Sequence, residues 1–127
     1  MRSRLLKPNL LLSTLAFLLS SCANHHFRIA SDAPPASAPR SVQLLVDKQV
    51  ANLHFPAGIY SFYALDDTGW YYRAGRAIVQ HTGGGSVMRS GGIYVSKRDP
   101  HKLRGYIFYA GALTHVGDLS RTPHELR

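Results

Sequence analysis

The chain has 127 residues and a formal net charge of +8, with 15 lysine and arginine residues against 7 acidic ones. This length leaves room for one domain. The single cysteine excludes an intramolecular disulfide and any zinc site built from several cysteines. We therefore expect one small domain that is stabilised by packing rather than by cross-links.

The start of the chain has the pattern of an export signal. Arg2, Arg4 and Lys7 precede the apolar or weakly polar stretch Leu10–Leu19. A basic segment, an apolar stretch of about 7–15 residues and small residues at a cleavage site are typical of a secretory signal peptide. A membrane-spanning helix needs about 20 apolar residues, so this stretch is too short to be one. We predict that residues 1–21 are a signal peptide.

The residues Leu19-Ser20-Ser21-Cys22 resemble the lipobox of bacterial lipoproteins, which consists of a branched apolar residue, two small residues and a cysteine. The resemblance covers residues 1–22 only. It implies cleavage before Cys22 and attachment of fatty acyl chains, such as palmitate, to that cysteine. Ala23 stands where an aspartate commonly marks inner-membrane retention, which implies the periplasmic face of the outer membrane. The alternative is an ordinary signal peptide followed by a free or buried cysteine.

Charge narrows the choice of partners. Three of the 15 basic residues and none of the 7 acidic residues lie in the signal, so the mature chain carries a formal +5. A basic protein is attracted to anionic surfaces such as lipid headgroups or cell-wall polymer. Export argues against a nucleic-acid partner. The expected partners are the lipid bilayer, reached through acylated Cys22, and either another envelope protein or a cell-wall polymer.

Composition divides the rest of the chain into three parts. Residues 22–41 are rich in Ala, Ser and Pro, which predicts that the lipidated cysteine is followed by a disordered tether. Residues 42–117 are predicted to form a small β domain, and residues 118–127 a polar tail in which a brief helix is an alternative. The segment 41–53 fits either a strand or a helix, and its β-branched residues slightly favour the strand.

The clearest local structure is a β-hairpin. Ile59–Leu65 and Trp70–Ala74 are dense in strand-forming residues, and Asp66–Gly69 between them supplies turn chemistry. Arg76–His81 reads as the next strand and ends before Gly83–Gly85. Further strands are expected at Ile93–Ser96 and Leu103–Ala110, while Val87–Arg89 is ambiguous. Short strands separated by turns predict an all-β fold, a small antiparallel sandwich or partly open barrel.

Aromatic residues are predicted to supply much of the core, because each buries a large area. The expected core residues are Ile59, Phe62, Trp70, Tyr72, Ile78, Val95, Ile107 and Phe108. The strands also carry aromatic residues on their second face, which is either covered or exposed to sugar rings or peptide. If it is exposed, arginines there can provide charge-assisted hydrogen bonds. The candidate ligand-binding residues are Tyr71, Arg73, Arg76, Tyr94 and Tyr106.

No pattern of catalytic residues is present. The glycines before Ser86 lack the following Lys-Ser/Thr pair of a phosphate loop, and Met88 breaks the G-x-S-x-G pattern of hydrolases. Asp66 and Asp67 fit a turn, and the seven histidines are too scattered for a metal site. We predict no catalytic residue, no cofactor and no metal.

These observations favour a non-enzymatic envelope lipoprotein with a structural or interaction role. One alternative is a binding module for cell-wall glycan or another anionic polymer. A second alternative, a small periplasmic hydrolase, requires a cleft near His81, His115 and Asp118.

Overall fold

The computed structural model describes residues 27–29 and 33–119, where every regular element is a β-strand. In chain order the strands are β1 (Arg28–Ile29), β2 (Ser41–Leu44), β3 (Lys48–Val50), β4 (Leu53–Phe55), β5 (Gly58–Leu65), β6 (Gly69–Ala74), β7 (Ile78–Thr82), β8 (Gly85–Arg89), β9 (Gly91–Ser96), β10 (Leu103–Tyr109) and β11 (Ala112–Asp118). The predicted all-β fold is confirmed. The predicted signal peptide and Cys22 lie outside the described residues.

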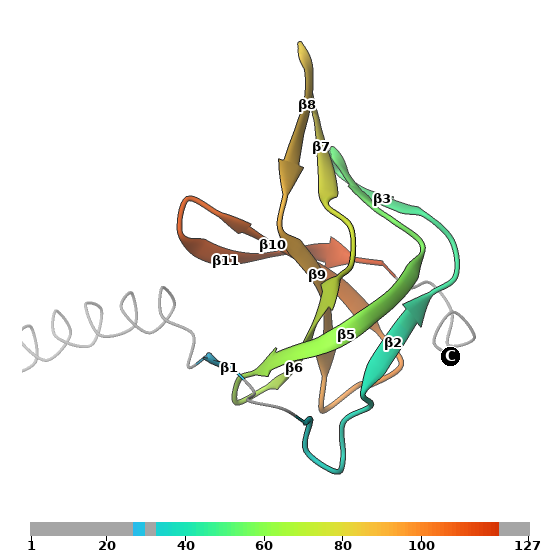
Figure 1. The fold of residues 1–127 in the computed structure, drawn as a ribbon, viewed down its shortest axis with the longest axis vertical. Coiled ribbons are helices and arrows are strands. Elements are labelled where there is room, and N and C mark those ends of the chain that lie inside the picture. Colours follow the sequence, from blue (N-terminus) through green and yellow to red (C-terminus); the bar gives the residue numbers. More distant parts are fainter. Residues whose placement is uncertain (1–26, 30–32, 120–127) are drawn as a thin grey trace, which may run out of the picture.

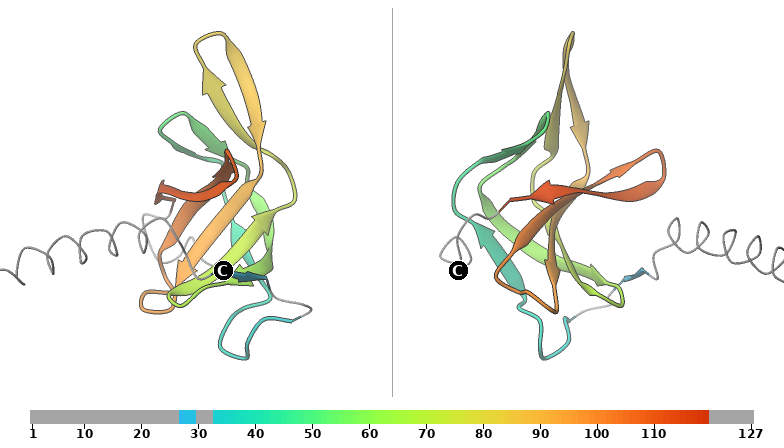
Figure 2. Two further views of the ribbon diagram at one scale, coloured as in Figure 1. Left: turned by 90° about the vertical axis from the view of Figure 1, so that its left-hand side faces the viewer. Right: turned by 180° about the vertical axis from the view of Figure 1, so that it is seen from behind.

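The strands form two antiparallel sheets (Figures 1 and 2). The first sheet has the order β1-β5-β6-β9-β10-β11, and β2 pairs with another stretch of β5. This sheet curls into a half-barrel, which confirms the expectation of a partly open barrel (Figure 2). The second sheet has the order β3-β4-β7-β8.

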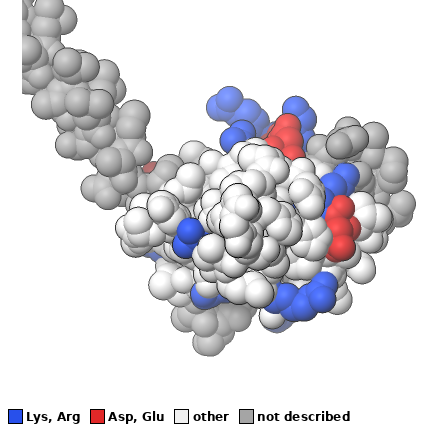
Figure 3. Space-filling view, turned by 90° about the horizontal axis from the view of Figure 1, so that it is seen from above, with Lys and Arg blue, Asp and Glu red and all other residues white. Residues whose placement is uncertain are grey.

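A long two-stranded ribbon connects the two sheets. β6 of the first sheet continues into β7 of the second through residues 75–77, and β8 returns into β9 through Ser90. Beyond this junction the β7–β8 hairpin projects from the domain (Figure 1). Residues 77–88 of the hairpin include no Lys, Arg, Asp or Glu. Figure 3 looks down on the hairpin and shows this uncharged centre with basic and some acidic side chains around it.

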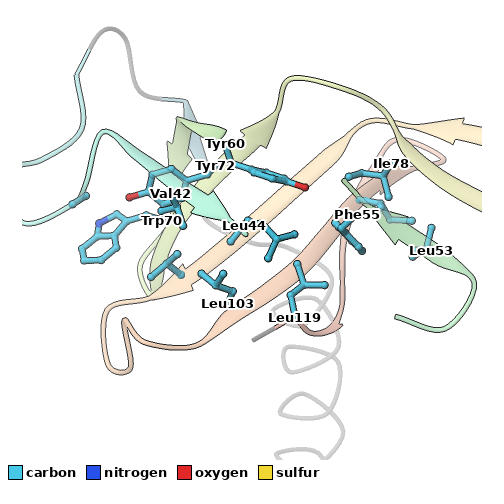
Figure 4. Close-up of a cluster of buried hydrophobic side chains, with 14 residues drawn as sticks. Val42, Leu44, Leu53, Phe55, Tyr60, Trp70, Tyr72, Ile78, Leu103 and Leu119 are labelled. Carbon is cyan, nitrogen blue, oxygen red and sulfur yellow. The ribbon is translucent and has the colours of Figure 1, made fainter. Parts of the chain in front are cut away.

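The main hydrophobic core takes side chains from both sheets (Figure 4). Most of the predicted core residues are buried in it, namely Trp70, Tyr72, Ile78, Val95 and Ile107. Phe62 packs against this core and is partly buried. The sequence analysis missed several core residues from the short strands β2 and β4, including Leu44 and Phe55, which are fully buried.

The predicted position of Ile59 in the core is wrong, because 61% of its surface is exposed. Ile59 pairs with Gln43 and shares its exposed face of the sheet. Burial on that face begins farther along β5, at Tyr63 and Ala64. Phe108 is partly buried, and it packs on that second face rather than in the main core.

In the segment 41–53 the favoured strand interpretation is confirmed, and the alternative of a helix is wrong. Val42 and Leu44 alternate with exposed neighbours in β2, as expected for a strand with one buried face. Two further short strands, β3 and β4, follow in the second sheet. Strand β11 had no counterpart in the sequence analysis. It pairs with β10, and the register shifts between Gly105 and Tyr106.

Parts of the segment predicted as a tether contact the domain. Strand β1 pairs with Ala64 and Leu65 at the end of β5. Farther along, Ala38 is buried, and the carbonyl oxygen of Pro39 accepts a hydrogen bond from the Tyr72 hydroxyl at 2.8 Å. The folded domain therefore begins before residue 42.

Candidate ligand-binding site

The strand register brings four of the five predicted ligand-binding residues to one face of the first sheet. Tyr71 pairs directly with Tyr94, while Arg73 and Tyr106 both pair with Gly92. Paired residues in an antiparallel ladder lie on the same face, as do residues two apart in a strand. Arg76 follows the end of β6 and lies in the junction between the sheets.

The three tyrosines form a second aromatic cluster instead of an exposed stripe. Tyr71 and Tyr106 are fully buried and Tyr94 is 6% exposed. The Tyr71 ring contacts the other two at centroid distances of 4.9 Å and 5.1 Å. The chain itself covers this face, with partly buried side chains from Phe27, Tyr63, Phe108 and Leu113. Of the five predicted residues, only Arg73 and Arg76 present exposed side chains.

A hydrogen-bond network lies at one end of this cluster. The Tyr71 hydroxyl donates to Asp66 Oδ2 at 2.7 Å and also contacts His115 Nε2 at 2.9 Å. A phenol has one hydrogen, which here goes to the carboxylate, so His115 Nε2 must donate to Tyr71. Burial, together with Asp66, raises the pKa of Tyr71. Tyr71 therefore stays a neutral phenol, which does not suit a nucleophile or a base.

Asp66 organises the turn before β6. Its Oδ1 accepts hydrogen bonds from the backbone N–H groups of Thr68 and Gly69 and from the Thr68 hydroxyl. The Thr68 hydroxyl in turn accepts from Tyr94 at 2.5 Å. Burial alone would raise the pKa of Asp66, but the hydrogen bonds from Tyr71, Thr68 and Gly69 outweigh it and lower the pKa. The network is thus a structural tie between the turn, β6, β9 and β11.

A basic pocket lies at the junction where the ribbon passes from one sheet to the other. This cavity of about 350 Å³ is lined by Arg73, Arg76 and Arg89, together with other residues from both sides of the ribbon. No acidic residue lines it. We call it the arginine pocket. Within the described residues, none of these three side chains forms an ion pair.

Aromatic and amide groups hold two of the arginines in place. The Arg73 guanidinium lies over the rings of Tyr63 and Phe108, at 4.8 Å and 5.9 Å from their centroids. The Arg89 guanidinium lies 4.5 Å from the Tyr109 ring centroid, and its Nε donates to a glutamine amide oxygen at 2.8 Å. Stacking fixes the orientation of a guanidinium without neutralising its charge. Both groups can therefore still form charge-assisted hydrogen bonds to an anion.

Arg76 is exposed and follows Gly75. Arg76 has only a weak electrostatic effect on Asp47: the hydrogen bond from Ala57 N–H is the main cause that lowers the pKa of Asp47, and Arg76 adds the smallest contribution. The exposed Arg76 guanidinium is therefore open to a ligand. The pocket can bind phosphate or carboxylate groups, which match the fork of a guanidinium.

The sequence analysis identified two of the three pocket arginines and missed Arg89. The segment Val87–Arg89 is ambiguous in the sequence, because glycines lie on both sides of it and it contains few apolar residues. Only the pairing of Ile78 with Arg89 brings this side chain to the junction. The binding role of the predicted residues stays a prediction.

The residues considered for a hydrolase do not converge. His81 lies in the second sheet, where its Nδ1 contacts Ser86 Oγ at 3.4 Å, while His115 bonds Tyr71 in the first sheet. Neither the arginine pocket nor a second cavity of about 400 Å³ beside Arg40 and Phe62 is lined by His81, His115 or Asp118. Within residues 27–29 and 33–119, no three His, Cys, Asp or Glu side chains gather as metal ligands.

Comparisons with known proteins identified no relative of this chain. No protein-family model, curated protein or solved structure matches this chain. In the part of the chain that the structure describes, no helix has the length and apolar character needed to cross a membrane.

Proposed function

We propose that this chain is an exported, lipid-anchored protein of the bacterial envelope and that its β domain binds an anionic polymer of the cell wall without catalysing a reaction. The anchor is Cys22, and Ala23 favours the periplasmic face of the outer membrane. The lipobox-like residues before Cys22 support the anchor. The arginine pocket supports the binding role, and it favours a polymer with phosphate or carboxylate groups over an unspecified protein partner.

The observation that carries the binding proposal is the set of three arginines around one cavity without a carboxylate among them. An anion in this cavity can accept hydrogen bonds from more than one guanidinium. Such charge-assisted bonds are about twice as strong as neutral ones. Arg73 and Arg89 are held by aromatic rings, so little side-chain entropy is lost when they bind.

Substitution of Arg76 tests the binding proposal. We expect Arg76→Ala to weaken co-sedimentation with purified peptidoglycan about tenfold, which corresponds to about 1.4 kcal/mol. Arg76→Lys should bind the polymer more weakly than the wild type and more strongly than Arg76→Ala, because lysine keeps the charge and loses the planar fork. Arg76 is exposed, so the folded domain should survive both changes.

The matched control is Lys97→Ala, which removes the same charge from an exposed turn. It should bind as the wild type does. Equal losses in Arg76→Ala and Lys97→Ala would reduce the effect to net charge and would contradict a specific pocket. Failure of the wild-type protein to sediment with the polymer at low salt would contradict the binding role itself.

Substitution of Cys22 tests the anchor. We expect Cys22→Ser to lose all incorporation of a palmitate analogue and to leave the membrane fraction. Ser20→Ala keeps a small residue at its position and should be labelled like the wild type. Equal labelling of Cys22→Ser and the wild type would refute lipidation at this residue.

A further inference from the structure

The chain docks on the domain a short distance after the proposed anchor. Phe27 lies only five residues after Cys22, and its ring packs on the rings of Tyr71 and Tyr63 at centroid distances of 5.1 Å and 6.0 Å. Arg28 and Ile29 then pair with β5. Five residues span at most about 18 Å even when fully extended. Acyl chains on Cys22 would therefore hold the Phe27 side of the domain close to the bilayer.

A second segment lies on the same side of the molecule. Both figures that view the fold from different directions place β1 and the turn between β10 and β11 on one side (Figures 1 and 2). The second aromatic cluster connects them, because it contains Phe27 next to β1 and both Phe108 and Leu113 from the β10–β11 hairpin. The two segments are thus linked by one packed cluster of side chains.

The chemistry of this surface suits the headgroup region of a membrane. Ile29 is 66% exposed and Tyr109 is 53% exposed. The turn that follows Tyr109, Ala110–Ala112, has no charged residue. Tyrosine is favoured at the membrane interface, where one end of the side chain is apolar and the other is wet. Arg28 is exposed beside Ile29, where it is placed to meet anionic headgroups.

We infer that this side of the domain, comprising Arg28, Ile29 and Tyr109–Ala112, lies directly against the lipid bilayer. We call it the membrane-facing side. The inference rests on the proposed lipidation of Cys22. In this view the domain does not hang on a long, free tether but is held in one orientation to the bilayer. The β7–β8 hairpin, which projects elsewhere from the domain, then points away from the lipid or along it (Figure 1).

Two fluorophore positions test the orientation in the full-length lipidated protein. A cysteine is introduced either at Ala112, on the membrane-facing side, or at Gly84, in the turn of the β7–β8 hairpin. Both positions are exposed, and an added Cβ at Gly84 would meet no other atom within 4 Å. Lipidated Cys22 has no free thiol, so a thiol-reactive fluorophore attaches only to the new cysteine.

The labelled proteins are placed in vesicles of phosphatidylethanolamine and phosphatidylglycerol that carry a lipid-bound quencher. We expect several-fold stronger quenching for Ala112→Cys than for Gly84→Cys. Equal quenching, or stronger quenching at Gly84→Cys, would overturn the orientation. Flotation of the protein with the vesicles and its incorporation of a palmitate analogue are measured in parallel. If the protein does not float with the vesicles and Cys22 reacts with the fluorophore, both the anchor and the orientation are overturned. If the protein floats but shows the reversed quenching pattern, only the orientation is overturned.

Discussion

A Gly92→Ala variant should lose about 3 kcal/mol or more of its free energy of unfolding, through overpacking between two strands. An added Cβ at Gly92 would lie 1.8 Å from the carbonyl oxygen of Tyr72 and 3.0 Å from the Cα of Arg73. Both are backbone atoms of β6, which pairs with β9 at this point. Relief requires the two central strands of the first sheet to separate. A domain of this size has only a few kcal/mol of net stability, so a large fraction of the Gly92→Ala molecules would be unfolded.

Gly84→Ala is the matched control. It makes the same change in the β7–β8 turn, where an added Cβ meets nothing within 4 Å. Its unfolding free energy in urea should stay within about 0.5 kcal/mol of the wild-type value, as for most surface substitutions. A Gly92→Ala protein that unfolds at the same urea concentration as Gly84→Ala would show that β6 and β9 are not packed this closely.

The parts of the fold that could be predicted from sequence are those fixed by local patterns. The β5–β6 hairpin was predicted because two aromatic-rich runs flank the turn Asp66–Gly69, and Asp66 does close that turn. Strand β11 could not be predicted in this way. It contains Gly117 with a φ of 148° and has a shifted register with β10, so no regular alternation marks it. Its position is set by a partner strand rather than by its own residues.

The candidate site was predictable to the same limited extent. Alternation along β6 correctly puts Tyr71 and Arg73 on one face. Whether that face is covered depends on contacts between distant segments. Tyr63 of β5 meets Phe108 of β10 at a ring-centroid distance of 6.2 Å, although β6 and β9 lie between their strands. The curl of the sheet that allows this contact follows from the whole ladder, and no local pattern in the sequence specifies it.

The buried face and the arginine pocket are coupled through the same residues. The rings of Tyr63 and Phe108 cover the tyrosine cluster on one side and support the guanidinium of Arg73 on the other. A folded aromatic cluster therefore positions an exposed charge at the junction. This arrangement explains why residues of one predicted site separate into a buried structural group and an exposed basic group.

Removal of the Asp66 carboxylate should destabilise the domain by about 3 kcal/mol, since it leaves buried hydrogen-bond donors without their charged acceptor. In Asp66→Ala the Tyr71 hydroxyl and the backbone N–H groups of Thr68 and Gly69 lose that acceptor. Asp67→Ala is the control, because its side chain is exposed and next in sequence. It should change the unfolding free energy by less than about 0.5 kcal/mol. Equal losses in the two variants would contradict the network.

The same carboxylate makes stability depend on pH in a defined direction. The pKa of Asp66 is lowered in the folded domain, so the unfolded chain takes up a proton first as the pH falls. Its stabilisation is therefore fully present above the ordinary carboxyl pKa of 3.8 and is lost as the pH falls through the lowered folded value. The pKa of Asp47 is lowered as well, mainly by the Ala57 N–H, so part of the acid sensitivity should remain in Asp66→Ala. Urea midpoints measured from neutral to acid pH should fall less steeply for Asp66→Ala than for the wild type, whereas parallel curves would mean that Asp66 is not held as a carboxylate by Tyr71 and the turn.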